Sequence, residues 1–293
     1  MDKRHLLILG CGYVGERLAH VCVTEGIKVT ATTRNEARAD ELRAEGISAV
    51  VADSPVSLSD ELLEQCDAVL DSIPLTRDES GMHASQLQWL TEIAPKLNKL
   101  KWAGYLSTTG VYGDADGVWV DESWACNPSS PRGSERLKAE NAWLNSGLPA
   151  EVFRIAGIYG PERNILSRLR ASGYQAVQWE PPHYSSRIHV DDIVDALMAA
   201  MQKPRAGRIM NLADDEPLPH ADYVIAVAAM LGAPTPEVLT PEEGERLLSP
   251  AMLDFFRDNK KVSNRLLHTE LLESLKYPNF RDGIKALISE EGE

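Results

Sequence analysis

The sequence predicts an α/β protein built on a doubly wound parallel sheet, and three observations support this prediction. Apolar runs of strand length alternate with helical patterns through the first half of the chain. A glycine-rich turn joins the first apolar run to the first helical pattern, and the second run, 28–33, is rich in β-branched residues. Strands and helices in this alternation form a parallel sheet with helices on both faces, and ligands bind at the carboxyl ends of its strands.

The first strand, 5–9, runs directly into a GxGxxG turn, and a helix is predicted over 13–25. Gly10 allows a sharp turn, Gly12 lets a pyrophosphate approach the backbone, and Gly15 lets the helix pack closely on the strand. The helix offers free N–H groups and its positive dipole end to the phosphates. A dinucleotide site is therefore predicted here, the alternative being a tight turn without a ligand. The remaining turn residues expected at the cofactor are Cys11, Tyr13 and Val14.

The other elements are predicted from periodicity and from glycine and proline positions. Strands are expected at 47–52, 68–71, 101–106, 151–155 and 208–212. Helices are expected at 36–45, at 83–98, from 131 onward, and up to about residue 202. After Pro217 the pattern is mainly helical, with segments at 220–231, 241–248, 251–259, 264–273 and 279–289.

The end of the second strand bears on which dinucleotide binds. A NAD-specific site usually has Asp or Glu here, about twenty residues after the first glycine, to bind the ribose 2′-OH. This chain has Thr32-Thr33-Arg34-Asn35, with no acid at the tip. A guanidinium can hold a 2′-phosphate through two hydrogen bonds, so Thr33 and Arg34 favour NADP over NAD. The alternative is an arginine that caps a surface turn.

Further candidate cofactor contacts lie at the ends of other strands. Asp53 follows the third strand, where it either meets the adenine or caps the next helix. Ser72, Ile73 and Pro74 follow the fourth strand, and Pro74 directs the chain across the carboxyl edge of the sheet. Ser107 follows the fifth strand. We expect all five residues to line the cofactor site.

The composition excludes several classes of function. A formal net charge of −14 argues against nucleic acid and against anionic membrane surfaces, although a local arginine cluster can still bind an anion. The first residues are polar and do not form a signal peptide, and no apolar run is long enough to span a bilayer. We therefore expect a small-molecule substrate, no nucleic acid and no membrane, and the sequence leaves a homodimer open.

The cysteines are scattered and form no CxxC pair. Neither a metal site nor a disulfide framework is indicated, so we expect reduced thiols in a cytoplasmic protein. The four cysteines are Cys11, Cys22, Cys66 and Cys126.

Six sequence blocks occur in a diagnostic order: GYVG, STTGVYGD, VDE, RIAGIYGP, SRIHVDDI and NLADDEP. Together they resemble the extended short-chain dehydrogenase/reductase superfamily, which contains nucleotide-sugar epimerases and dehydratases. The GxGxxG turn departs from the GxxGxxG usual in that family, so the chain resembles its atypical members. The resemblance implies a Rossmann-type NADP-binding core over 1–158, completed by about 189–214. It also implies a small, mainly helical substrate lobe over 159–188 and 215–293.

The family's usual catalytic set is a Ser or Thr, a Tyr and a Lys, the last two spaced Tyr-x-x-x-Lys. By resemblance, Thr108 fills the hydroxyl position, whereas Arg132 and Arg136 stand where the Tyr and Lys belong. No tyrosine in the chain is followed four residues later by lysine. A guanidinium stays protonated, so Arg132 cannot shuttle a proton as a phenol does. Tyr112 could replace the lost acid, the alternative being a tyrosine packed under the substrate loop.

Arg132 and Arg136 lie one helical turn apart, so with Arg187 they could hold a carboxylate or phosphate. The alternative is that both are helix charges paired with Glu135 or Glu140. By resemblance, the cofactor site extends to Ala156 and Ile158, and the substrate contacts are Thr109, Arg163, Asn164 and Arg187.

His189 precedes Asp191-Asp192, a grouping that could form a metal or base site. We expect the acids to cap the following helix instead, and no metal is expected.

Two hypotheses for function follow. The first is an NADP-binding oxidoreductase, or an epimerase that uses its nucleotide transiently, acting on a small anionic or nucleotide-sugar substrate held by Thr108. The second is a non-catalytic NADP(H) sensor, because both the Tyr and the Lys have been replaced.

Overall fold

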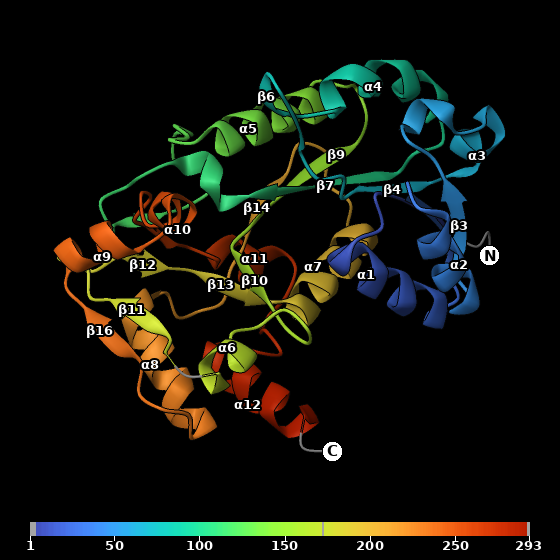
Figure 1. Cartoon of the computed structure of the whole chain (residues 1–293). Helices are drawn as coiled ribbons and strands as arrows, with labels where there is room; N and C mark the ends of the chain where they lie inside the picture. The colour runs from blue at the N-terminus through green and yellow to red at the C-terminus, as the bar shows by residue number, and fades with distance from the viewer. Residues whose placement is uncertain (1–3, 172, 292–293) are drawn as a thin grey trace. The chain divides into compact units, whose positions relative to one another are not determined.

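The computed structural model describes residues 4–171 and 173–291, and its central element is a seven-stranded sheet (Figure 1). The strand order is β14-β9-β7-β4-β1-β2-β3, and the neighbouring pairs from β3 to β7 run parallel. Every residue of β1 is buried, as expected for a strand covered on both faces. The strands are β1 (His5–Leu9), β2 (Lys28–Thr33), β3 (Ser48–Val51), β4 (Ala68–Asp71), β7 (Trp102–Thr108), β9 (Ala150–Ile155) and β14 (Ile209–Leu212).

Helices cover both faces of this sheet, which confirms the doubly wound α/β prediction (Figure 1). One face carries α1 (Tyr13–Thr24), α2 (Glu36–Ala44) and α7 (Val190–Gln202). The opposite face carries α3 (Asp60–Gln65), α4 (Gln86–Ile93) and α5 (Pro131–Leu144).

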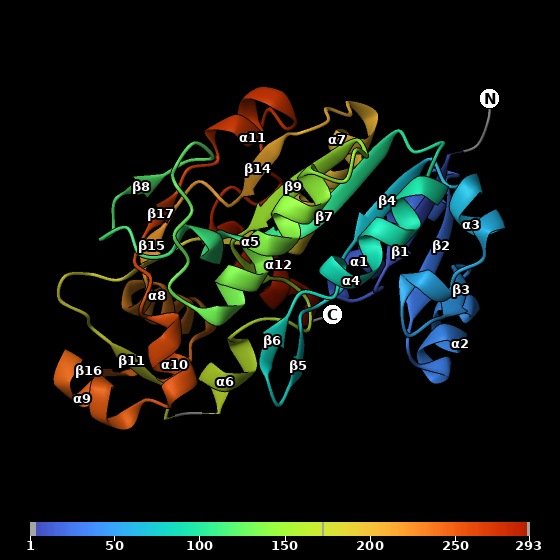
Figure 2. The same cartoon turned by 90° about the horizontal axis from the view of Figure 1, so that it is seen from above.

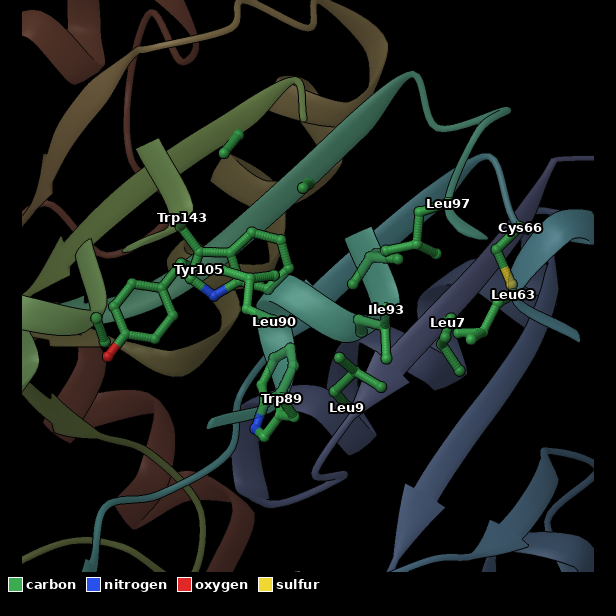
Figure 3. Close-up of a cluster of buried hydrophobic side chains, with 14 of the residues drawn as sticks. Leu7, Leu9, Leu63, Cys66, Trp89, Leu90, Ile93, Leu97, Tyr105 and Trp143 are labelled. Carbon is green, nitrogen blue, oxygen red and sulfur yellow. The ribbon is translucent and has the colours of Figure 1, made fainter. Parts of the chain in front are cut away.

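The core on the second face is built from leucines of β1 and aromatic residues of α4 and α5 (Figure 3). Trp89 of α4 and Trp143 of α5 meet edge to face, with ring centroids 6.0 Å apart. Leu7 and Leu9 point from β1 into the same cluster and are fully buried. This packing fixes α4 and α5 against the strands whose carboxyl ends form the candidate site.

The chain divides into two compact units. Unit 1 comprises Met1–Thr108, Pro131–Arg154 and Ile193–Met210, and unit 2 comprises Thr109–Ser130, Ile155–Asp192 and Asn211–Glu293. Unit 2 has its own core, in which Leu166, Tyr223, Val224 and Phe280 pack together. None of the helices in the described ranges is long and apolar enough to cross a bilayer.

Unit 2 is mainly helical, with short paired strands between its helices. Its helices are η3 (Thr109–Tyr112), α6 (Leu166–Arg170), α8 (His220–Leu231), α9 (Pro241–Leu247), α10 (Pro250–Phe255), α11 (Arg265–Glu270) and α12 (Phe280–Glu291). Its strands are β8 (Trp119–Val120), β10 (Gly157–Tyr159), β11 (Gln175–Val177), β12 (Tyr184–Ser185), β13 (Arg187–His189), β15 (Leu218–Pro219), β16 (Glu237–Leu239) and β17 (Lys261–Val262). These short strands were not predicted, because two or three residues carry no readable alternation.

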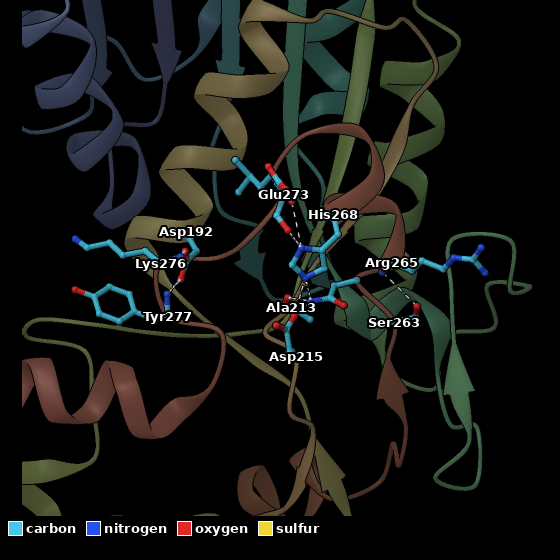
Figure 4. A network of polar contacts seen from close by, with 11 residues as sticks. Asp192, Ala213, Asp215, Ser263, Arg265, His268, Glu273, Lys276 and Tyr277 are labelled. Carbon is cyan, nitrogen blue, oxygen red and sulfur yellow. Dashed lines mark hydrogen bonds and ion pairs between the residues drawn. The ribbon is translucent and has the colours of Figure 1, made fainter.

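A polar network anchors the segment after α11 (Figure 4). The buried carboxylate of Asp192 accepts hydrogen bonds from the backbone N–H groups of Lys276, at 2.6 Å, and Tyr277, at 3.1 Å. His268 and Asp215 form an ion pair at 2.8 Å in the same view. Asp192 lies inside α7 and holds the backbone at 276–277, so its role is structural but is not the capping of the helix after His189 that the sequence predicted.

The predicted helix at 83–98 is wrong at both ends. Its first residue belongs to a β-hairpin, β5 (Thr76–Asp78) and β6 (Gly81–His83), which stands out from the sheet before α4 (Figure 2). The hairpin turn is stabilised by Asp78, whose Oδ1 accepts the Ser80 N–H at 2.8 Å. At the other end, the α-helix stops at Ile93 and a 3₁₀ turn, η2 (Ala94–Lys96), follows because proline interrupts the pattern.

Candidate functional site

The glycine turn has the backbone geometry that its sequence requires. Gly10 has φ +74°, a conformation that side chains disfavour, and a Cβ there would approach Ile73 to 3.0 Å. A Cβ on Gly15 would approach Ile8 of β1 to 3.0 Å, so this glycine allows α1 to lie close to the strand. The turn is fixed to β2 because Thr32 accepts the N–H of Gly10 on its hydroxyl, at 2.9 Å, and the N–H of Cys11 on its carbonyl, at 2.8 Å.

Gly12 differs from the other two glycines, because a Cβ built on it would meet no atom within 4 Å. It occupies the N-cap position of α1, at the positive end of that helix. Its backbone is extended, with φ −103°, so neither strain nor packing demands glycine here. The open space beside Gly12 fits the phosphates of a dinucleotide, whose approach a side chain would obstruct. Tyr13 and Val14 begin α1 directly after it.

Cys11 lies in the turn and is buried. Burial, with a further contribution from Glu16, raises the pKa of its thiol to about 12. The thiol is therefore protonated at neutral pH, and Cys11 contributes bulk and backbone groups to the turn rather than a nucleophile.

Two arginines stand near the end of β2. Arg34 is exposed and is followed by Asn35, which caps α2 by accepting the Arg38 N–H at 3.2 Å. Arg34 is therefore not the residue that caps this turn. Arg38, which sequence reasoning missed, forms ion pairs with Glu16 of α1 and with Glu41. Its position four residues after Arg34 in a predicted helix was the available signal.

Asp71, at the end of β4, is a buried carboxylate that sequence reasoning also missed. It accepts hydrogen bonds from the backbone N–H of Ile73 at 3.0 Å, from Gln86 of α4 at 2.9 Å and from Trp143 of α5 at 2.8 Å. Burial raises the pKa of Asp71, and these three donors oppose that shift. One side chain thus fixes the turn after β4 to the two helices beside it.

Arg136 meets this turn from the side of α5. Its Nη1 donates to the carbonyl oxygens of Ile73 and Leu106, both at 3.3 Å, and to the Tyr105 hydroxyl at 3.0 Å. Ile73 also lies against Gly10. The glycine turn and the Arg136 guanidinium therefore both contact the backbone at Ile73. Arg136 is thus a positioned cation, and the hydrogen bonds that hold it are not those of the alternative, a pairing with Glu135 or Glu140.

A buried ion pair lies beneath Ser107 and continues the site along β7. The Ser107 hydroxyl donates to Glu140 at 2.6 Å, and Arg154 binds the same carboxylate, with Nη2 at 2.8 Å. Arg154 and Glu140 are 4% and 1% exposed, so breaking this pair would leave a buried charge. The Ser107 hydroxyl is therefore used inside the protein by Glu140, whereas Thr108, the last residue of β7, is half-buried. Arg132 is exposed in the first turn of α5.

Tyr112 and Thr109 belong to unit 2, in η3. Tyr112 is fully buried, and its hydroxyl donates to Asn211 at 2.7 Å. A phenol in this position packs beneath the loop, which was the alternative to its acting as the acid. Thr109 is half-buried at the start of the 3₁₀ turn.

The predicted substrate residues of unit 2 differ in how they are engaged. Asn164 donates to the carbonyl of Gly160 at 3.2 Å and accepts the Leu166 N–H at 3.0 Å, so its amide is used by the local backbone. Arg163 is exposed. Arg187 is buried, with its guanidinium carbon 3.8 Å from the centre of the Tyr223 ring, and Nη2 donates to Ser185 at 2.8 Å. Its Nη1 has no hydrogen-bond partner among the described residues.

The remaining candidates are placed as follows. His189 is buried, and its Nδ1 accepts the Asp191 N–H at 3.2 Å, so His189 and Asp191 are bound to each other at the start of α7.

Glu16, His20 and Glu45 bring ligand atoms within 4.8 Å of one another. Glu16 already binds Arg38 and His20 binds Glu45, so these groups pair without a metal. The last cofactor candidates lie at element ends, with Ala156 buried, Ser72 and Ile158 half-buried, and Asp53 and Pro74 exposed.

The comparisons with known proteins agree with this geometry. The model of the NAD dependent epimerase/dehydratase family matches residues 6–213, and the chain belongs to that family. Protein YeeZ of Escherichia coli is 28% identical over 80% of this chain and 86% of its own. A 3-diazoavenalumate denitrifying reductase from Streptomyces is 31% identical over 56% of this chain and 54% of its own.

Solved structures extend the comparison over nearly the whole chain. A functionally unknown conserved protein from Silicibacter pomeroyi is 34% identical with a TM-score of 0.88, covering 98% of this chain and 99% of that one. Two more distant structures share the fold. A human epimerase family protein with NADPH is 16% identical (TM-score 0.78, 97% and 99% covered), and a Bacillus anthracis dTDP-glucose 4,6-dehydratase with NAD is 17% identical (TM-score 0.74, 99% and 96% covered).

The side chain of Asp214, in unit 2, should make the free energy of unfolding depend on pH. Asp214 is buried, and neither carboxylate oxygen accepts a hydrogen bond of normal geometry from the described residues. Burial raises its pKa to about 8, and the charge of Arg187 only partly opposes that shift. The native state therefore keeps a proton that the unfolded chain loses near pH 4. The free energy of unfolding consequently falls as the pH rises from about 4 to about 8.

Asp214→Asn should remove this loss, which amounts to a few kcal/mol at most. Urea unfolding at pH 5 and pH 8 should show a smaller decrease for the variant than for the parent. Asp222→Asn, at an exposed position in α8, is the control and should follow the parent. Equal decreases in the parent and Asp214→Asn would mean that Asp214 titrates as an ordinary carboxylate.

Proposed function

We propose that this chain is an NADP-dependent oxidoreductase, or an epimerase with transient hydride transfer, that acts on a small anionic or nucleotide-sugar carbonyl substrate. Family membership supports an NAD(P)-dependent oxidoreductase or epimerase/dehydratase-like role. One relative is named a reductase, which supports the oxidoreductase form. The observation on which the proposal rests is the open backbone at Gly12 beside the start of α1.

Different residues of unit 1 would bind different parts of the dinucleotide. Gly12 would receive the pyrophosphate, because its backbone can be approached closely, while Gly10 and Gly15 shape the turn and bring α1 close to β1. Arg34, which is exposed after the end of β2, would hold the 2′-phosphate. Arg136 would place a fixed positive charge beside the cofactor ribose. A bound dinucleotide would supply the hydride.

Thr108 would hold the reacting oxygen of the substrate by hydrogen bonding. It is the last residue of β7 and is half-buried, so it stands at the carboxyl edge of the sheet. Arg132, exposed in the first turn of α5, would attract an acidic group on the substrate. Neither residue can supply a titrating proton at neutral pH.

A second proposal, a non-catalytic NADP(H) sensor, is favoured by one observation. The tyrosine and lysine positions hold arginines, and the buried Tyr112 donates its proton to Asn211. Such a protein would keep its nucleotide affinity without turnover.

The cofactor assignment is tested by calorimetry with NADPH and NADH on the parent and on Arg34→Ala. Losing a charge-assisted phosphate contact should weaken NADPH binding by about 1.5–3 kcal/mol, roughly 10- to 150-fold, and leave NADH binding unchanged. Arg257→Ala, which removes an exposed guanidinium of the same charge from another segment, is the control. Equal affinity of the parent for NADH and NADPH would show that Arg34 does not select the cofactor.

Thr108→Val separates the enzyme from the sensor. The variant should lose at least about 100-fold in turnover of whichever aldehyde, ketone or nucleotide sugar the parent converts, because the reacting oxygen loses its partner. Its NADPH affinity should stay within about twofold of the parent's. Nicotinamide absorbance across a substrate panel gives the first quantity, and calorimetry gives the second. A parent that binds NADPH tightly and converts nothing would favour the sensor.

A further inference from the structure

The oxidoreductase proposed above needs a proton source that the usual motif does not provide. Of the tyrosines considered, Tyr112 is buried and donates to Asn211. Tyr105 lies beside Arg136 but is fully buried, and burial raises its pKa despite the nearby guanidinium. A phenol that is buried and held protonated cannot meet a substrate oxygen. Neither Tyr105 nor Tyr112 is therefore placed to donate the proton.

The unpredicted hairpin β5–β6 lies beside the helix that carries Arg132 and Arg136. Strand β6 packs against α5, and the backbone N–H of Ala84, directly after this strand, donates to Glu135 of α5 at 3.0 Å. Glu135 is three residues from Arg132, so the two side chains are neighbours on the helix surface. The end of β6 therefore stands within about one helical turn of the position where the family has its tyrosine.

The residue that ends β6 is His83, and it belongs to a polar trio within the hairpin. Its Nε2 lies 2.9 Å from the Ser80 hydroxyl and 3.0 Å from Asp78 Oδ1. The Ser80 hydroxyl in turn donates to the same Asp78 oxygen at 2.6 Å. Hydrogen bonds from Ser80 and then His83 lower the pKa of Asp78 to about 2, so the carboxylate beside the imidazole stays ionised.

The charges around His83 are those of Asp78 on its own hairpin and Glu135 on α5. Glu135 has its pKa lowered first by a hydrogen bond from Lys138, and the charge of His83 contributes to the same shift. The His83 side chain is 36% exposed, so it can exchange protons with water after each turnover.

The other histidines of unit 1 are badly placed for this task. His5 is buried at the start of β1, at the edge of the sheet opposite to the glycine turn, and it is bound to Thr30. His20 lies on α1 and pairs with Glu45 at 3.1 Å. Only His83 combines an exposed imidazole, a supporting carboxylate and a position beside α5 within the described part of unit 1.

We propose that His83 is the catalytic proton donor of this protein, in the part that the missing tyrosine plays in its relatives. A bound reduced dinucleotide would supply the hydride: its C–H bond would break, a C–H bond would form at the substrate carbonyl carbon, and the electron pair of the C=O π bond would move to the oxygen. The His83 N–H bond breaks, and its proton forms the O–H bond of the product alcohol. The neutral imidazole then takes a proton from water, while the hydrogen bond to Asp78 keeps the ring in place. This inference rests on the proposed oxidoreductase function.

The first test is whether a bound dinucleotide covers His83. Diethyl pyrocarbonate modifies exposed imidazoles, and peptide mass spectrometry gives the rate at each histidine with and without saturating NADP⁺. Modification of His83 should slow at least fivefold when NADP⁺ is bound. His20 is a matched control, since it too is exposed and paired with a carboxylate, and its rate should not change.

The outcomes separate the two proposals. If calorimetry shows NADP⁺ binding but the His83 rate does not change, the histidine lies outside the site and this inference fails while the proposed function stands. If NADP⁺ does not bind, both fail.

The second test uses His83→Gln, with His20→Gln as control. His83→Gln should lower kcat/KM for a carbonyl substrate by at least about 100-fold and abolish the limb of the pH profile that the imidazole produces. Its NADPH affinity should stay within twofold of the parent's, and its melting temperature should match that of His20→Gln. A retained kcat/KM, or a pH profile unchanged from the parent's, would overturn the inference.

Discussion

The buried carboxylate of Asp71 is the interaction on which the candidate site depends. It binds the backbone of Ile73, the side chain of Gln86 on α4 and the indole of Trp143 on α5. A buried acid is costly unless its oxygens are fully used, and these three donors use them. Because Ile73 also touches Gly10 and accepts from Arg136, the position of Asp71 sets where the glycine turn and the α5 cation lie relative to each other.

This arrangement explains how the backbone at the end of β4 and β7 is held in place with arginine at position 136. Nη1 of Arg136 donates to two backbone carbonyls and to the Tyr105 hydroxyl, so the guanidinium ties the turn after β4 to β7. Below it, Glu140 and Arg154 form a buried pair that also holds Ser107. The edge is therefore rigid and positively charged on the α5 side, while titrating chemistry has to come from elsewhere.

Much of the fold was predictable, because its signals are local. The run 5–9 and the GxGxxG turn specify β1, the sharp bend and α1 without reference to the rest of the chain, and α7 and α8 end where their apolar patterns end. The hairpin at 76–83 was missed even though Asp78, Ser80 and Gly81 are turn-forming residues, because its strands are only three residues long. The buried roles of Asp71 and Glu140 were missed because a buried acid is recognised only through its partners, which are Trp143 for Asp71 and Arg154 for Glu140.

The central claim is that the space beside Gly12 receives the phosphates of a dinucleotide, and Gly12→Val tests it most directly. Valine suits the extended backbone at this position and its Cβ meets no protein atom within 4 Å, so the variant should fold, with its melting temperature lowered only by the less favourable N-cap residue. The affinity for NADPH in calorimetry should nevertheless fall at least tenfold, because the side chain would occupy the place of the phosphates. Unchanged NADPH affinity in a folded Gly12→Val variant would contradict the account.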